Sequence, residues 1–496
     1  MITDYAAEGK ALAKYEGKVI FVSGAVPGDI ADVLITKSKK EWAEGRAVFI
    51  STYSAEREAP FCEHFGICGG CKWQMLPYKK QLQYKEQEAL QNLKRIGKLE
   101  LPEIYPIIGA DDTKHYRNKL EFTFSNKRFL TEAPPPPRGG LASPIPIAIG
   151  TSEGGALEDP ANSLRSSESS DSENPPLGVG GALGYHVPRI FDKVIDINQC
   201  YLMDDVNNSI RNTIRSFALE HNFLFYDIRQ HTGWLRNIII RLTGTGELMV
   251  NICLNYDAAA DRKKLFDHLL KTVPSISTLL YTINSKWNDS IYDLTPQVYY
   301  GKGYVMEKLG SGTGEEFKFK ISPKSFFQTN TRQAEKLYKV TAEFAGLTGN
   351  ETVYDLYCGT GSIGIFLSRQ AKKIIGVDVV EEAIVDAREN AALNNITHAE
   401  FFAGDVIKIC NAEFFALHGR PDVIITDPPR AGMHEKLVNK LLEITAPKIV
   451  YVSCNTATQA RDLALLAEKY RVEKIQPVDM FPHTHHIECV VLLKLK

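Results

Sequence analysis

The sequence predicts a multi-domain protein with three parts: a small N-terminal β-barrel over residues 1–57, a central α+β domain over 58–320 and a C-terminal Rossmann-like α/β domain over 321–496. Length is the first reason, because 496 residues are too many for one hydrophobic core. The second is a change of pattern along the chain. Short alternating strands open it, whereas buried strands alternate with helical patterns towards its end.

Residues 1–57 alternate apolar and polar side chains between glycines and prolines, as in 19–22, 31–35 and 45–49. This pattern predicts the short strands of a small β-barrel. Barrels of this kind often bind RNA, and scaffolding or partner docking fits the pattern equally well. The chain shows no apolar run of membrane-spanning length and no signal peptide, so we expect a cytoplasmic protein without a membrane partner.

Three cysteines follow the barrel in a compact loop, and a fourth lies far downstream: Cys62, Cys68, Cys71 and Cys200. Without a secretory context, thiols indicate metal binding, catalysis or reduced side chains rather than disulfides. Four soft thiolates suit an iron–sulfur cluster or zinc. Zinc loops tend to consist of two tight cysteine pairs, so three clustered thiols with one remote partner favour the cluster.

The segment after the cysteines combines a helix with basic charge. Leu82, Leu90, Leu93 and Ile96 are spaced for one apolar face of a helix over 77–97. Residues 72–128 hold twelve Lys and Arg against seven Asp and Glu, a balance of +5. Five aromatic residues are interleaved with them: Trp73, Tyr78, Tyr84, Tyr105 and Tyr116. This combination suits phosphate contact and base stacking, and equally an ordinary solvated face.

Residues 131–183 interrupt the central domain with a different composition. A proline run at 134–137 precedes an acidic serine tract at 166–173, and few large hydrophobic residues are available for a core. We therefore expect a disordered insertion in a surface loop. Beyond it, a helix over 206–221 and strands over 237–241 and 248–253 predict the rest of the α+β domain.

A glycine-rich turn organises the C-terminal domain. A short apolar run precedes Gly359, Gly361 and Gly364, and a second one ends in Asp378. The glycines let the backbone approach a ligand at the start of a helix, and an acid about 20 residues further on can accept hydrogen bonds from ribose hydroxyls. The stretch therefore predicts a nucleoside-binding half-fold, and the spacing also fits a dinucleotide site.

Acidic residues favour S-adenosylmethionine as the ligand of this turn. Asp355, four residues before Gly359, places a carboxylate near a cationic or amino-bearing ligand, which a pyrophosphate would repel. Asp405 and Asp427 follow further apolar runs, so acids end successive strands. The carboxyl ends of such strands form the crevice in which open α/β sheets bind their ligands.

Two further residues suggest covalent chemistry. Cys454 follows the apolar run 448–452 and lies between the polar residues Ser453 and Asn455. The position at a strand end and the polar neighbours favour a nucleophile over a packed thiol. Glu488 follows three histidines, at 483, 485 and 486, and such neighbours favour a general base with a shifted pKa. A metal site on the histidines is the weaker alternative, since their spacing lacks a helical i, i+4 pair.

Six ordered motifs resemble the RNA uracil-5-methyltransferases, and most closely the bacterial 23S rRNA uridine methyltransferases that carry an iron–sulfur cluster and an N-terminal TRAM barrel. They are Cys-x5-Cys-Gly-Gly-Cys at 62–71, Phe-Phe-Gln-Thr-Asn at 326–330, Asp-Leu-Tyr-Cys-Gly-Thr-Gly at 355–361, Asp-Pro-Pro-Arg at 427–430, Ser-Cys-Asn at 453–455 and His-His-Ile-Glu at 485–488. The resemblance covers nearly the whole chain except 131–183. Two departures are a shortened start of the barrel and the insertion itself.

The resemblance implies an enzyme that methylates carbon 5 of a uridine in 23S rRNA, and we expect it to be a monomer. It assigns a [4Fe-4S] cluster to Cys62, Cys68, Cys71 and Cys200. It assigns S-adenosylmethionine to Gln328, Tyr357, Asp378, Asp405 and Asp427. Cys454 is then the nucleophile and Glu488 the base, with Arg430 and Asp427 as candidates for the uracil pocket. A tRNA substrate and a non-catalytic RNA-binding or ribosome assembly factor remain as alternatives.

Overall fold

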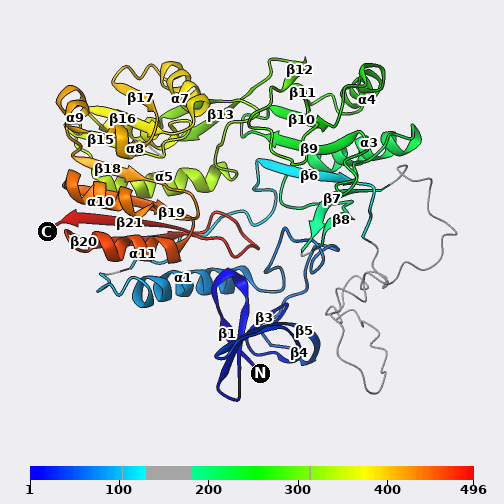
Figure 1. Ribbon diagram of the computed structural model, residues 1–496, viewed down its shortest axis with the longest axis horizontal. Coiled ribbons are helices and arrows are strands. Elements are labelled where there is room, and N and C mark those ends of the chain that lie inside the picture. Colours follow the sequence, from blue (N-terminus) through cyan, green and yellow to red (C-terminus); the bar gives the residue numbers. More distant parts are fainter. Residues whose placement is uncertain (103, 130–180, 189, 312–313) are drawn as a thin grey trace.

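The computed structural model describes residues 1–102, 104–129, 181–188, 190–311 and 314–496 (Figure 1). The predicted fold class is confirmed: a domain of strands comes first, a mixed sheet with helices follows, and an α/β sheet ends the chain. In the described part of the chain, no helix is long and apolar enough to cross a membrane.

The N-terminal domain is a five-stranded sheet with the order β1-β2-β3-β5-β4. The segments 19–22, 31–35 and 45–49, predicted as strands, lie within β3, β4 and β5. A small core of Ile2, Ala11, Val22 and Ala25 holds the sheet together. The elements are β1 (Ile2–Tyr5), the 3-10 turn η1 (Ala7–Gly9), β2 (Ala11–Tyr15), β3 (Lys18–Ser23), β4 (Ile30–Ser38) and β5 (Trp42–Thr52).

Helix α1 (Tyr78–Arg95) confirms the helix predicted over 77–97, but its buried face matches the predicted apolar face only in part. Its buried residues are Gln81, Lys85, Ala89 and Leu93, whereas Ile96 is exposed. The helix packs along α11 (Thr456–Leu466), as Figure 1 shows. The buried polar residues of this face bind the loop 479–487, and these contacts decide which face of the helix is buried.

The central sheet has seven strands in the order β12-β11-β10-β9-β6-β7-β8. Helices α3 (Val206–Glu220) and α4 (Ala259–Thr272) pack with its apolar face in one core. The strands are β6 (Lys119–Ser125), β7 (Ala182–Val187), β8 (Ile190–Asp196), β9 (Leu235–Leu242), β10 (Leu248–Leu254), β11 (Thr278–Ile283) and β12 (Gln297–Tyr300). Most of the predicted insertion, 131–180, lies outside the described residues. β7 begins two residues before the position at which the sequence places the return of the fold.

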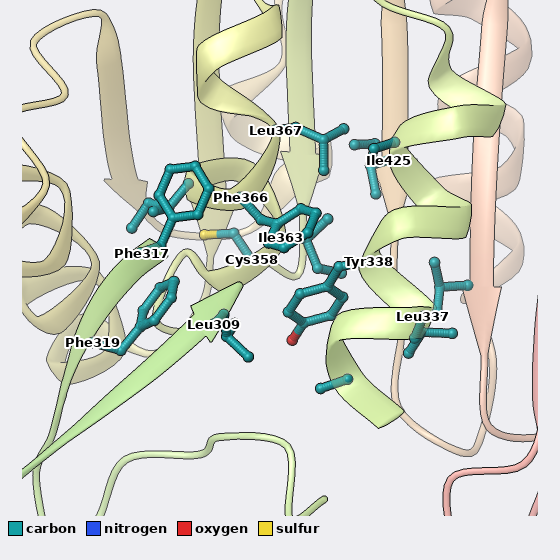
Figure 2. Close-up of a cluster of buried hydrophobic side chains, with 14 of the residues drawn as sticks. Leu309, Phe317, Phe319, Leu337, Tyr338, Cys358, Ile363, Phe366, Leu367 and Ile425 are labelled. Atoms are coloured by element: carbon teal, nitrogen blue, oxygen red, sulfur yellow. The ribbon is translucent and has the colours of Figure 1, made fainter. Parts of the chain in front are cut away.

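A hairpin of β13 (Val305–Gly310) and β14 (Glu316–Ile321) packs onto the C-terminal domain. Figure 2 shows Leu309, Phe317 and Phe319 directed towards Phe366 of α6 (Ser362–Leu367) and Tyr338 of α5 (Thr331–Ala345). The hairpin therefore supports the glycine turn from outside the sheet.

The C-terminal sheet has the order β17-β16-β15-β18-β19-β21-β20, with β17 to β19 parallel and β21 antiparallel to both neighbours. The carboxyl ends of the five parallel strands consequently meet at one edge. The strands are β15 (Thr352–Leu356), β16 (Lys373–Asp378), β17 (Ala399–Ala403), β18 (Val423–Thr426), β19 (Lys448–Ser453), β20 (Tyr470–Val478) and β21 (Glu488–Leu495). The remaining helices are η2 (Ser368–Gln370), α7 (Glu381–Leu393), α8 (Val406–Ile409), α9 (Ala412–His418) and α10 (Glu435–Ile444).

Candidate functional site

The glycine turn is fixed by two acids that accept backbone hydrogen bonds. Gly359 N donates to Asp378 Oδ2 and Gly364 N donates to Asp355 Oδ2, both at 2.9 Å. Gly361 has a φ of +75°, and a Cβ there would lie 2.9 Å from the Phe401 ring. Only glycine meets both conditions, so the turn keeps its backbone open to a ligand.

Asp355 is an internal brace of this turn. Its carboxyl is 1% exposed, which differs from the expectation that it faces a ligand. Burial raises its pKa to about 7, and the neighbouring carboxylates of Asp427 and Asp378 push it in the same direction. Three carboxyl groups therefore lie close together beneath the turn.

The residues proposed for the methyl donor gather at the carboxyl ends of the strands. Tyr357 follows β15 with a φ of +61°, and Asp378 ends β16. Asp405 follows β17 and caps α8 by accepting from Ile407 N at 2.9 Å. Burial raises the pKa of Tyr357, and the carboxylates of Asp405 and Asp378 contribute, so the phenol lies near both acids.

Gln328 reaches the same edge from another part of the chain. It lies before α5 and is buried, and its carbonyl oxygen accepts from Asn118 Nδ2 at 2.9 Å. Asn118 N also donates to Thr329 O at 2.8 Å. Asn118, just before β6, thus holds the Phe-Phe-Gln segment, and Thr360 Oγ1 of the glycine turn donates to Phe326 O at 3.5 Å.

Cys454 and Glu488 come from neighbouring antiparallel strands. Ser453, which ends β19, pairs with Cys489 of β21, so Cys454 and Glu488 stand next to each other just beyond that pair. Cys454 is half-buried and Glu488 is buried. Burial raises the pKa of the Cys454 thiol to about 11, and the carboxylates of Glu488 and Asp427 raise it further.

Asp427 and Glu488 form a close pair of acids. Burial raises the pKa of Glu488 well above its usual value, Asp427 adds to the effect, and the guanidinium of Arg430 opposes it. The pKa of Asp427 is raised to about 7 by burial. Asn455 Nδ2 and Thr458 Oγ1 donate to Arg430 O at 3.1 and 3.2 Å, so the start of α11 fixes this loop.

The loop 479–487 that leads into Glu488 is anchored by α1, through residues that sequence reasoning missed. Lys85 Nζ donates to Asp479 Oδ1 at 2.6 Å, and Tyr78 Oη donates to Asp479 Oδ2 at 2.8 Å. Gln81 accepts from His483 N at 2.8 Å. Gln81 and Lys85 are four residues apart and so share one face of the helix, but nothing in the sequence around them signals that this face is buried.

The four cysteines line one cavity with largely apolar walls that include Phe61, Tyr185 and Ile197. They are Cys62, Cys68, Cys71 and Cys200. Burial raises the pKa of each thiol, and the thiols influence one another. Gly70 N donates to Cys68 Sγ at 3.4 Å. Across the described ranges, no group of three or more His, Cys, Asp or Glu converges as a site for a metal ion.

Three of the five aromatic residues interleaved with the basic segment are not available for stacking. Trp73 is 1% exposed and Tyr116 is buried. Tyr78 hydrogen-bonds to Asp479. These three rings serve the core and the α1 anchor, whereas Tyr105 is exposed, so the five rings do not form one stacking surface.

Comparison with known proteins identifies the family. A family model described as tRNA (uracil-5-)-methyltransferase matches residues 294–496, and a TRAM domain model matches residues 1–48. A Bacteroides thetaiotaomicron protein described as an uncharacterized RNA methyltransferase is 49% identical over 494 residues, covering 99% of this chain and 100% of the relative. A Porphyromonas gingivalis protein with the same description is 47% identical, covering 99% and 98%.

A solved structure covers the same extent. It is the Pyrococcus abyssi tRNA (uracil-54, C5)-methyltransferase in complex with S-adenosyl-L-homocysteine, with a TM-score of 0.69, 24% identity and 99% coverage of both chains. At that identity the match shows a shared fold. The relatives and the family models place the chain in the RNA uracil-5-methyltransferase family.

Proposed function

We propose that this RNA uracil-5-methyltransferase transfers the methyl group of S-adenosylmethionine to carbon 5 of a uridine in 23S rRNA through a covalent adduct with Cys454. The observation that supports it most is the pairing of a thiol and a buried carboxyl, Cys454 and Glu488, at the sheet edge that also carries the glycine turn.

The chemistry requires both groups. Carbon 5 of uracil is a weak nucleophile, so the thiolate of Cys454 first forms a bond to carbon 6 and leaves carbon 5 as an enolate carbon. Carbon 5 then attacks the methyl group, the bond from methyl to sulfonium breaks, and S-adenosylhomocysteine leaves. Glu488 removes the proton from carbon 5. The electron pair restores the double bond and expels the thiolate.

The electrostatics of the pair fit these roles. A raised pKa makes the Glu488 carboxylate a stronger base once it is ionised. The raised pKa of Cys454 lowers the fraction of reactive thiolate, and a protonated thiol does not add to uracil. The Arg430 guanidinium lowers the pKa of Cys454, and we assign it the task of favouring the thiolate. With Asp427, it also lines the pocket proposed for the flipped base.

The methyl donor is assigned to the strand ends. In this proposal Asp378 receives the ribose hydroxyls, Asp405 and Asp427 flank the adenine and the methionine part, and Tyr357 and Gln328 close the sides. The open backbone of the glycine turn and the concentration of carboxylates support a cationic nucleoside over a pyrophosphate.

The cysteine cavity is proposed to hold a [4Fe-4S] cluster. Four thiols on one apolar cavity, with an N–H donated to one sulfur, are the donor set that such clusters use. Bound there, a cluster would link the cysteine loop to the segment before α3 covalently. A brown protein with broad absorbance near ~400 nm supports this assignment, and a colourless protein with stoichiometric zinc contradicts it.

The choice of RNA is tested in cells. We propose 23S rRNA as substrate, with the enzyme acting as a monomer in the cytoplasm, where cysteines do not form disulfides. A tRNA uridine is the second candidate, because the matched structure is a tRNA methyltransferase. Mapping of 5-methyluridine in rRNA and tRNA from cells with and without the gene separates them. Loss of a single rRNA site supports the proposal, and loss of a tRNA site overturns the rRNA assignment.

A further inference from the structure

The loop between β11 and β12, residues 284–296, carries two of the most exposed aromatic side chains of the described structure. Trp287 is 79% exposed and Tyr292 is 70% exposed. We call these residues the aromatic loop. Large aromatic rings stabilise the folded protein when they are buried. A tryptophan held in solvent therefore calls for another explanation, such as a ligand.

The aromatic loop is firmly built. The fully buried guanidinium of Arg236 donates from Nη1 to the carbonyl oxygens of Asn284 and Lys286, both at 2.6 Å. Its Nη2 donates to Asn288 O at 3.1 Å and to Asp289 Oδ1 at 2.8 Å. These bonds fix the backbone on both sides of Trp287, so its exposure belongs to an ordered loop.

The Trp287 ring is also oriented. The His231 imidazole lies parallel to the indole, with ring centroids 4.7 Å apart and an interplanar angle of 8°. His231 Nδ1 is held by the Tyr226 hydroxyl at 3.0 Å. One face of the indole is therefore stacked and the ring is largely exposed elsewhere, which leaves a flat π surface available to a ligand.

The aromatic loop is continuous with the proposed site. Lys324 Nζ donates to Tyr292 O at 2.8 Å, and Lys324 lies two residues before Phe326, which is 66% exposed. Arg241 of β9 donates from Nη2 to Ser325 O at 3.2 Å. Lys324 thus joins the backbone of the aromatic loop to the segment that carries Phe326 and Gln328.

The charges near the loop are mostly paired. Lys286 pairs with Asp293 and Arg236 pairs with Asp289, which leaves Lys324 as the additional cation of this set. Flat rings with little net charge suit a nucleobase, because stacking on aromatic side chains is tolerant of sequence and needs no phosphate contact.

We propose that Trp287 and Tyr292 form a stacking platform for unpaired nucleotides that flank the target uridine in the RNA substrate. The proposal rests on the proposed function, since it takes RNA as the substrate. It also explains how a base can leave its stack for the pocket at Cys454: neighbouring bases that stack on the platform compensate for part of the stacking energy that the RNA gives up when the uridine flips out.

The test measures RNA binding without methyl transfer. A fluorescently labelled, unstructured 12-nucleotide RNA containing uridines is titrated with wild-type protein and with Trp287→Ala, Trp287→Phe and Tyr292→Ala. Stacking contributes about 1–3 kcal/mol per base, so the alanine variants should bind roughly 5- to 150-fold more weakly. Trp287→Phe should keep most of the affinity. The slope of log Kd against log salt should stay unchanged, because no phosphate contact is removed.

Phe191→Ala is the matched control. Phe191 is 62% exposed and lies on β8, at the opposite edge of the same sheet from β12. The Phe191→Ala variant should bind RNA as tightly as wild type. Unaltered binding of S-adenosylmethionine by calorimetry shows that the variants are folded. RNA affinity unchanged in Trp287→Ala and Tyr292→Ala, with methylation retained, would overturn the platform alone. Wild-type protein that binds no RNA would overturn the platform and the proposed function together.

Discussion

Gln81 and His483, 402 residues apart, are joined by a hydrogen bond from His483 N to Gln81 Oε1 at 2.8 Å. The Gln81 amide also donates to the carbonyl oxygens of Trp73 and Leu76, and His483 O accepts from Lys72 N and Trp73 N. The segment that follows Cys71 and the loop that leads into Glu488 are therefore held by one side chain. α1 fastens the cysteine cavity to the proposed catalytic strand.

Gln81→Leu should loosen this connection. The substitution leaves the buried His483 N–H and the Leu76 carbonyl oxygen without partners, and each unsatisfied group costs about 1–3 kcal/mol. We expect a lower Tm and a reduced kcat with a nearly unchanged KM for S-adenosylmethionine. Gln83→Leu on the exposed side of α1 is the control. The connection is unimportant if both variants match wild type in thermal unfolding and in methyl transfer.

Lys85 and Asp479 form a fully buried ion pair, and their separate removal should be costly. Lys85→Met leaves an uncompensated buried carboxylate, which typically costs about 3–5 kcal/mol. The double variant Lys85→Met with Asp479→Asn should recover part of the loss, because the stranded charge is gone. Urea unfolding of Lys85→Met, of Asp479→Asn and of the double variant measures the coupling energy between the two residues. Additive losses would show that the pair does not act as a unit.

Asp355 should make the stability depend on pH. Its pKa is raised by burial to about 7 in the folded protein and is about 3.9 when unfolded. The protonated carboxyl is favoured by folding, so its stabilisation is complete below about pH 4 and is lost as the pH rises through about 7. Asp355→Asn keeps an oxygen for Gly364 N and does not titrate. Relative to wild type, it should gain Tm at pH 8 and little at pH 5; equal gains would contradict the assignment.

Arg430 should control the reactivity of Cys454. Its guanidinium lowers the pKa of the thiol against the effects of burial and two carboxylates. Arg430→Ala raises that pKa further, so less thiolate is present at pH 8. Alkylation of Cys454 by iodoacetamide, followed by mass spectrometry of the peptide that contains it, should slow several-fold. Arg430→Lys should keep most of the rate. The other cysteines serve as internal references, and an unchanged rate in Arg430→Ala would remove Arg430 from this role.

Sequence reasoning succeeded where the signal is contiguous. The glycine turn and the acids at 378, 405 and 427 each follow an apolar run, and parallel pairing brings such ends together. It failed where burial depends on a distant partner. The face of α1 is set by Asp479, 394 residues from Lys85, and composition does not reveal such a pair. For the same reason the sequence predicted Trp73 as a stacking residue although it is buried. Trp287 was not predicted, because its loop contains no recognisable motif.

The covalent roles of Cys454 and Glu488 are tested most directly by trapping the adduct. Glu488→Gln should still methylate carbon 5 but release the RNA about 10²–10⁴ times more slowly, because the base that removes the proton is missing. Incubated with total rRNA and S-adenosylmethionine, this variant should form a protein–RNA band that resists denaturant. The band should require the methyl donor, and it should be absent from the double variant Glu488→Gln with Cys454→Ala. A Glu488→Gln enzyme that turns over normally, or a band that survives Cys454→Ala, would contradict the assignment.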